Sequence, residues 1–245
     1  MFDRLVAKGF DIRFESHAQA ILERDFSSAC WSIEQALADL EIPVSHLVGS
    51  GGGESLITQG LRRRLEADGW AKHQFSVTIS VDGTQVVSQS HAVDHFRREL
   101  DVGSLALEIE WNNKDPFFDR DLDTFRRLHA QGALSVGIVV TRGESLQVGL
   151  VQAIQAYLAS RVGDGPMSGE ADLRGARTGR QNVNLAKLLA SGRPYSEAAA
   201  MDLVRDKFGA ATTHWAKLRE RLERGAGKPC PLLLLGIPVG CLVPD

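Results

Sequence analysis

The chain has 245 residues, of which 43% are hydrophobic and 24% charged, and its formal net charge is −3. This composition supplies an ordinary buried core, which excludes a disordered chain. The slightly acidic net charge excludes a surface that is basic all over, but it does not exclude a local basic cleft that binds nucleic acid. The longest apolar run, residues 231–237, is too short to span a membrane, and we expect no secretory signal at the N-terminus.

The three cysteines are odd in number and lack the spacing of metal ligands, so they predict a reducing cytoplasm without disulfides: Cys30, Cys230 and Cys241. We interpret residues 1–245 as a single domain. It begins with a helical N-terminal part, residues 1–48. Within this part a helix is predicted over residues 30–40, because apolar side chains recur there at spacings of three and four: Trp31, Ile33, Ala36, Leu37 and Leu40.

An amphipathic helix is predicted from Glu54 to Asp68, with Leu56, Leu61 and Leu65 on its apolar side and Gly69 as a left-handed cap. After Trp70 the apolar period changes to two, which predicts a strand through Phe75, Val77, Ile79 and Val81. Asp82-Gly83 is a strong hairpin signal, and a second strand follows through residues 86–96. Residues 105–111 form a predicted third strand.

Phe118, Leu122, Phe125 and His129 are spaced for a helix that ends at Gly132, and an apolar strand follows at residues 134–140. Strand, helix and apolar strand in this order predict a βαβ crossover with a buried parallel pair. The predicted order of helices and strands in residues 54–140 is therefore α-β-β-β-α-β. We interpret residues 163–181 as a mobile loop rich in Gly and Arg, and residues 182–245 as C-terminal helices and a strand.

Three acidic residues carry the chemistry of the predicted sheet. Glu108 and Glu110 point to the same face of their strand, because strand side chains alternate, and Asp94 comes from the neighbouring strand. Converging carboxylates repel one another, and a hard divalent cation such as Mg²⁺ relieves that repulsion. The alternative is a solvated sheet face, which is common for alternating acids. Asp101 and Glu99 also precede Glu108, but they fall in a predicted turn, so Asp94 is preferred.

The runs that carry a family resemblance are residues 106–122 (ALEIEWNNKDPFFDRDL) and 135–143 (SVGIVVTRG), with shorter matches at 51–54, 90–95 and 212–218. Together with the acidic triad they resemble the BglII/BstYI-type type II restriction endonucleases of the PD-(D/E)xK nuclease superfamily. The resemblance implies an α/β fold with a restriction-endonuclease-like α-β-β-β-α-β core, a mixed sheet flanked by helices, and N- and C-terminal helical additions. It implies a homodimer that uses Mg²⁺ to cut double-stranded DNA at a palindrome centred on GATC.

The resemblance also implies roles for the acidic residues. Asp94, Glu108 and Glu110 would be catalytic. The metal would be bound by Asp94, Glu108 and Ile109, the residue between the two glutamates. Glu110 departs from the lysine that the general motif has at this position and is similar to the BamHI-like version. Whether Glu110 is a metal ligand, a base, or both stays open. His91 and His95 are assigned no catalytic role.

DNA contacts are predicted at three places. Asn112 and Asn113 follow the catalytic strand, and their amides suit the reading of base edges. Lys114 would neutralise phosphate charge or be a solvated loop lysine. Arg142 would contact guanine, or else a phosphate or the surface. Thr212, Thr213 and His214, at a predicted helix start, would reach bases or phosphates, unless the threonines are ordinary helix caps.

The basic clusters of the chain are interpreted as solvated faces unless one lines the cleft: residues 62–64, Arg97, Arg98, Arg174, Arg177 and Arg180. The loop 163–181 is a candidate for ordering on DNA. Two other functions stay open at this point. One is a repair or modification-dependent nuclease on the same core, and the other is a nuclease-like DNA-binding protein whose site has decayed.

Overall fold

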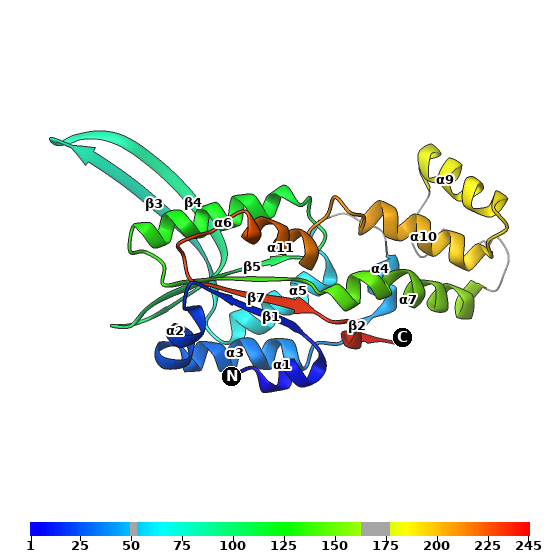
Figure 1. The fold of residues 1–245 in the computed structure, drawn as a ribbon, viewed down its shortest axis with the longest axis horizontal. Helices are drawn as coiled ribbons and strands as arrows, with labels where there is room; N and C mark the ends of the chain where they lie inside the picture. The colour runs from blue at the N-terminus through cyan, green and yellow to red at the C-terminus, as the bar shows by residue number, and fades with distance from the viewer. Residues whose placement is uncertain (50–52, 163–176) are drawn as a thin grey trace.

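The computed structural model describes residues 1–49, 53–162 and 177–245. Its centre is a six-stranded mixed sheet in the order β1-β7-β6-β5-β4-β3 (Figure 1). β5, β6 and β7 run parallel, while β1, β4 and β3 are added antiparallel. The strands are β1 (Asp11–Glu15), β3 (Ala71–Val81), β4 (Thr84–Glu99), β5 (Gly103–Glu110), β6 (Val136–Arg142) and β7 (Leu232–Ile237). The α-β-β-β-α-β order predicted for residues 54–140 is confirmed.

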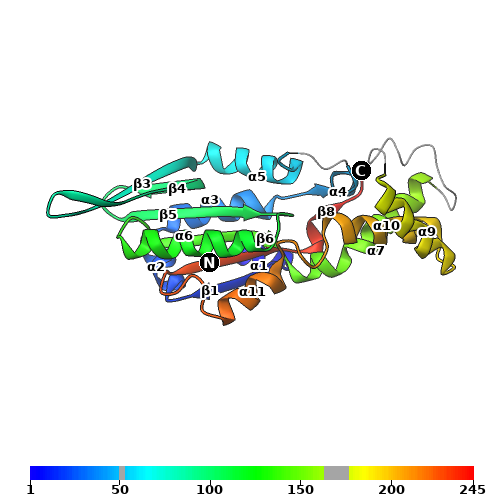
Figure 2. The ribbon, with the colours of Figure 1, turned by 90° about the horizontal axis from the view of Figure 1, so that it is seen from above.

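Helices cover both faces of this sheet (Figures 1 and 2). α6 (Pro116–Ala130) and α11 (Trp215–Glu223) lie on one face, where they pack against Ala106, Val139 and Leu234. The other face carries α1 (Asp3–Lys8), α2 (Ala18–Asp25), α3 (Ser27–Ala38) and α5 (Leu56–Ala67). Because the central parallel strands are buried on both sides, their sequences are continuous apolar runs rather than alternating ones.

Further helices extend the molecule beyond the carboxyl ends of the central strands (Figure 2). They are α4 (Val44–Val48), α7 (Glu144–Val162), α9 (Gly179–Ala190), α10 (Tyr195–Lys207) and the short η1 (Val239–Cys241). A separate parallel pair joins β2 (Ile42–Pro43) to β8 (Leu242–Val243). α7 was not predicted, although Leu146, Leu150, Ile154 and Leu158 are buried at the helical spacing of four. No helix in the described ranges is long and apolar enough to cross a membrane.

The structure corrects several sequence-based expectations. The N-terminal part, residues 1–48, is not wholly helical, because residues 11–15 form β1 and pair with β7 from the other end of the chain. Trp31 is 60% exposed and Leu56 is 56% exposed, so neither belongs to the predicted apolar stripe, and Ile57 is buried instead. Residues 163–176 of the predicted mobile loop lie outside the described residues. Its end is ordered, because Thr178 and Gln181 form a capping box at the start of α9.

The hairpin between β3 and β4 produces a fork in the sheet, and this fork positions the site. Asp82 and Gly83 have φ values of 49° and 78°, which confirms the predicted turn, and Gly69 caps α5 with φ 86° as expected. β4 pairs with β5 only from His95, opposite Leu107, to Glu99, opposite Gly103. Beyond His95 the β3–β4 ribbon leaves the sheet and projects past it (Figure 1). The sheet therefore forks where Asp94 would otherwise pair with Glu108.

Candidate active site

The fork brings the first two predicted acids together. The Asp94 N–H donates a hydrogen bond to Glu108 Oε1 at 3.3 Å instead of to a strand partner. Glu108 is 5% exposed, whereas the Asp94 side chain is 59% exposed, with its Oδ1 3.6 Å from Lys72 Nζ. The alternative acid Glu99 pairs with Arg97, and Asp101 occupies a turn. Both lie at the other end of β5, so Asp94 is the acid adjacent to Glu108.

α6 supplies a further carboxylate that the sequence analysis missed. Asp121 is 3% exposed and Glu110 is 2% exposed. Their carboxyl groups are close enough to share a hydrogen bond when one of them is protonated. Arg120 Nη2 lies 2.7 Å from Asp121 Oδ1 and 3.6 Å from Glu110 Oε1. A signal for Asp121 was present, because it stands three residues after Phe118 and four before Phe125, on the apolar stripe of an amphipathic helix.

Burial dominates the electrostatics of these acids. It raises the pKa of Glu108 well above the ordinary value, and the neighbouring charges of Asp121, Asp94 and Glu110 add to that rise. Burial, followed by the charge of Asp121, raises the pKa of Glu110 to about 8, against the hydrogen bond that Asn113 donates. The pKa of Asp121 is also raised by burial, although Arg120 counteracts this. These three acids, Glu108, Glu110 and Asp121, form a carboxylate cluster that needs protons or a cation to be stable.

These raised pKa values predict how the stability of the cation-free protein depends on pH. The folded protein binds more protons than the unfolded chain between the ordinary glutamate pKa of 4.5 and the Glu110 pKa of about 8. The stabilisation of the folded protein by the proton on Glu110 is therefore complete below the ordinary glutamate pKa, and it is lost as the pH rises through about 8. We expect the thermal unfolding temperature to fall between about pH 5 and about pH 8.5, and Glu110→Gln to reduce that fall. Calorimetry in chelator checks this, and a flat profile would contradict it.

The donor chemistry fits a magnesium ion, but the ligands are not assembled. Glu108, Glu110 and Asp121 offer only carboxylate oxygens, which Mg²⁺ prefers, and the buried Asp121 Oδ2 receives no hydrogen bond from any described residue. Ile109 packs into the apolar core, so only its main-chain carbonyl could reach a metal. Within residues 1–49, 53–162 and 177–245, no three His, Cys, Asp or Glu side chains are yet arranged to hold a metal ion. The carboxylate of Asp94 contacts Lys72 instead.

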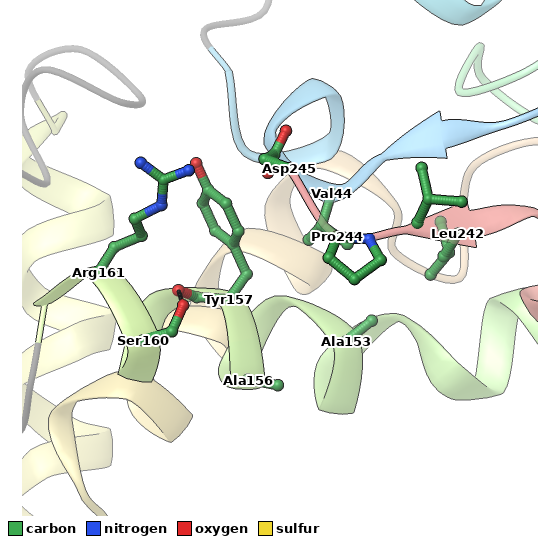
Figure 3. Close-up of a pocket in the computed structure, with 10 residues that line it drawn as sticks. Val44, Ala153, Ala156, Tyr157, Ser160, Arg161, Leu242, Pro244 and Asp245 are labelled. Carbon is green, nitrogen blue, oxygen red and sulfur yellow. Dashed lines mark hydrogen bonds between the residues drawn. The ribbon is translucent and has the colours of Figure 1, made fainter.

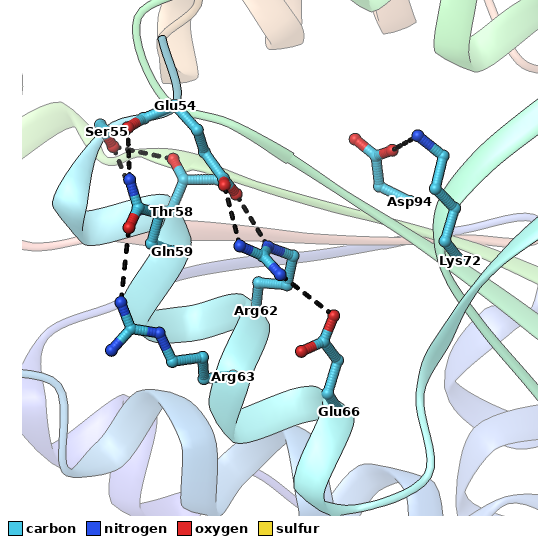
Figure 4. A network of polar contacts seen from close by, with 9 residues as sticks. All are labelled: Glu54, Ser55, Thr58, Gln59, Arg62, Arg63, Glu66, Lys72 and Asp94. Atoms are coloured by element: carbon cyan, nitrogen blue, oxygen red, sulfur yellow. Dashed lines mark hydrogen bonds and ion pairs between the residues drawn. The ribbon is translucent and has the colours of Figure 1, made fainter.

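A cleft of about 570 Å³ opens beside the acids. One wall is the start of α5, where Arg62 binds Glu54 and Glu66, and the Lys72–Asp94 pair lies across from this network (Figure 4). The other wall is the end of β5 and the start of α6, with Glu110, Asn112, Asn113 and Arg120. Of the predicted basic clusters, Arg62 lines this cleft. Other described members make other contacts, such as Arg177 with Asp202, Arg180 is exposed at the start of α9, and Arg174 lies outside the described residues.

Two of the predicted DNA-contacting segments lie side by side. The segment after β5 pairs with the segment before α11: Lys114 bridges to Thr212, and the Thr213 N–H donates to the Asn113 carbonyl at 2.8 Å. Asn113 is exposed, and its Nδ2 donates to Glu110 Oε2 at 2.8 Å. Thr213 and His214 are buried, and His214, rather than a threonine, is the N-cap residue of α11. Asn113 and Lys114 are thus the exposed members of the predicted set, and Asn112 and Thr212 are half-buried.

Arg142 differs from its expected role. It is fully buried, and burial lowers its pKa to about 9. Its Nη2 donates to Thr212 Oγ1 at 2.7 Å and to the Thr213 carbonyl at 2.6 Å, and its guanidinium lies 4.9 Å from the ring of Phe208. A guanidinium enclosed in this way cannot reach guanine or phosphate without a rearrangement. In this structure Arg142 holds the segment before α11 in place.

A second cavity, of about 370 Å³, lies away from the acids, between α7 and the C-terminal residues (Figure 3). Tyr157, Ser160 and Arg161 line it on the helix side. The side chain of Asp245, which also lines it, accepts a hydrogen bond from the Ser45 N–H at 3.1 Å. Its described lining contains no second acidic side chain, so the cleft beside Glu110 is the candidate active site.

A scan against protein families gives a match that spans most of the chain. The family model described as restriction endonuclease BglII/BglIII matches residues 10–237. This range includes β1 through β7, the forked strands and both segments beside the cleft. No curated protein matches the chain. The resemblance drawn from residues 106–122 and 135–143 is confirmed by the family match.

Proposed function

Because the chain belongs to the BglII/BglIII restriction endonuclease family and is a type II site-specific deoxyribonuclease, we propose that it cuts both strands of a short palindrome in double-stranded DNA, with Mg²⁺ as cofactor. The observation that carries this proposal is the fork of β4 and β5, which sets Asp94 against Glu108 at a cleft that Glu110 lines. The acids, the opening and the polar side chains for DNA all meet at this one edge of the sheet.

In the proposed site, Asp94, Glu108 and the main-chain carbonyl of Ile109 would hold the metal. For this the Asp94 carboxylate would leave Lys72, which it contacts in the structure. A bound divalent cation polarises a phosphoryl oxygen and lowers the pKa of a bound water. Glu110 would orient the attacking water or accept its proton, because its carboxylate lines the cleft beside the Asp94–Glu108 pair. Asn113 fixes the orientation of the Glu110 carboxylate through the hydrogen bond at 2.8 Å.

For DNA recognition we propose that Asn112 and Asn113 read base edges and that Lys114 contacts phosphate, since these residues follow the catalytic strand and are accessible. Thr212, Thr213 and His214 support this surface from the paired segment, and Arg142 positions that segment. A homodimer would present the same surface to each half of a palindrome centred on GATC. The three free, buried thiols agree with a reducing cytoplasm.

The experiment that tests this function is incubation with unmethylated phage DNA, with and without Mg²⁺, followed by sequencing of the ends. We expect discrete fragments whose ends share one palindromic sequence cut symmetrically on both strands, and no cleavage in chelator. Nicking alone, or cutting only of modified DNA, would instead indicate a repair or modification-dependent nuclease. DNA binding without any cleavage would indicate a decayed site.

A further inference from the structure

Among the residues that the structure describes, one cationic side chain is in direct contact with the buried acids of the site. Glu108, Glu110 and Asp121 are between 2% and 5% exposed. Neutral donors reach two of them, namely the Asp94 N–H and the Asn113 amide. Arg120 adds a full positive charge, with Nη2 at 2.7 Å from Asp121 Oδ1 and 3.6 Å from Glu110 Oε1. This guanidinium therefore supplies much of the charge compensation that buried carboxylates require.

Arg120 also stands between these acids and the solvent. Glu110 and Arg120 line the cleft of about 570 Å³, whereas Glu108 and Asp121 do not. The Arg120 side chain is 58% exposed and rests against the ring of Phe117, with its guanidinium carbon 4.4 Å from the ring centre. It is thus a surface side chain folded back onto buried acids, unlike the enclosed Arg142. A cation that enters from the cleft meets Arg120 before it reaches Asp121.

We infer that Arg120 is a positioning residue that acts as the internal counter-ion of the carboxylate cluster, and that it gives up this place when a divalent cation binds. A divalent cation held by Asp94 and Glu108 would place a second positive charge next to this guanidinium, which the carboxylates of Asp121, Glu110 and Glu108 all attract, so the two cations would repel each other. DNA phosphates offer the displaced arginine new partners, which would couple metal binding to DNA binding. This inference rests on the proposed metal site and adds to it a control on when that site assembles.

The electrostatics of Arg120 agree with this role. Burial alone would lower the pKa of its guanidinium, but the carboxylates of Asp121, Glu110 and Glu108 outweigh burial and raise it. The other arginines of α6 differ in this respect. Arg126 is 44% exposed and pairs with Asp123, one turn earlier on the same helix, at 2.6 Å. Arg126 is therefore a matched control, with the same charge and helix but no contact with the cluster.

The test measures Mn²⁺ binding to the free protein by electron paramagnetic resonance, at about pH 8.5 so that protons compete less. We expect Arg120→Met to bind Mn²⁺ about tenfold more tightly than the wild type without DNA, because a repelling charge has been removed from the site. Arg120→Lys keeps a charge and should stay near the wild type, and Arg126→Met should stay within about twofold because its charge is distant and screened.

The outcomes separate this inference from the proposed function. If the wild type binds Mn²⁺ and Arg120→Met binds it no more tightly than Arg126→Met does, the counter-ion role is wrong while the metal site stands. The same holds if Arg120→Lys behaves like Arg120→Met, since charge is then not what matters. If the wild type and all variants bind no Mn²⁺, the metal site itself is wrong and the inference fails with it.

Discussion

Replacing Glu108 by glutamine is expected to lower the rate of DNA cleavage by on the order of a thousandfold or more, while DNA binding without metal stays intact. Glutamine has nearly the same shape, and its carbonyl can still accept the hydrogen bond that the Asp94 N–H now donates to Glu108 Oε1. What it loses is the negative charge that holds a divalent cation at the fork. Cleavage needs that charge, whereas the exposed polar residues that would contact DNA are unchanged.

The same substitution should make the cation-free protein more stable. Burial raises the pKa of Glu108, which means that the folded protein disfavours its charged form. A neutral isostere removes that cost, and we expect the free energy of unfolding to increase at about pH 8, where the unfolded chain would have its glutamate ionised. Glu223→Gln, at an exposed position at the end of α11, is the matched control and should change neither property.

Cleavage kinetics, electrophoretic mobility shifts in chelator and calorimetry together check this prediction. Loss of cleavage combined with a gain in stability is the signature of a functional charge held in an unfavourable place. A Glu108→Gln protein that cleaves within about tenfold of the wild type would remove Glu108 from the proposed site. A protein that loses both cleavage and stability would instead give Glu108 a structural role.

Replacing Arg142 by methionine is expected to lower cleavage by about a hundredfold, because the segment before α11 loses its anchor and small misplacements of contact residues are costly. Nη2 and Nε of Arg142 make three hydrogen bonds to Thr212 Oγ1 and the Thr213 carbonyl. That segment pairs in turn with residues 113–115, next to the catalytic strand. Loosening one segment therefore loosens both.

Overall stability should change much less than cleavage in this variant. Losing the hydrogen bonds costs stability, but a buried guanidinium whose pKa is lowered to about 9 was itself unfavourable, and the two effects offset each other. Hydrogen–deuterium exchange should rise in residues 209–215 with little change elsewhere. Arg161→Met is the control, since Arg161 contacts Tyr157 at the other cavity. Unchanged exchange in residues 209–215 would contradict the anchoring role.

The local elements of the core were predictable because short-range physics determines them. Asp82-Gly83 specifies its turn, the alternation of residues 75–81 specifies a strand, and the spacing from Phe118 to Phe125 specifies α6. β1 was missed because its strand character depends on pairing with β7, at the opposite end of the chain. Trp31 was misplaced because helical spacing places it near the apolar stripe, whereas the described elements leave its side chain largely exposed.

By itself, the sequence determined that Glu108 and Glu110 share a face, because the side chains of any strand alternate. It also determined that a parallel strand follows β5, because a helix separates two apolar runs. Only the tertiary structure decided what meets that face. The fork in the sheet brings Asp94 to Glu108, and the crossover path of α6 delivers Asp121 and Arg120 to Glu110. Periodicity fixes the direction in which a side chain points, whereas its neighbours depend on contacts between distant segments that no local pattern encodes.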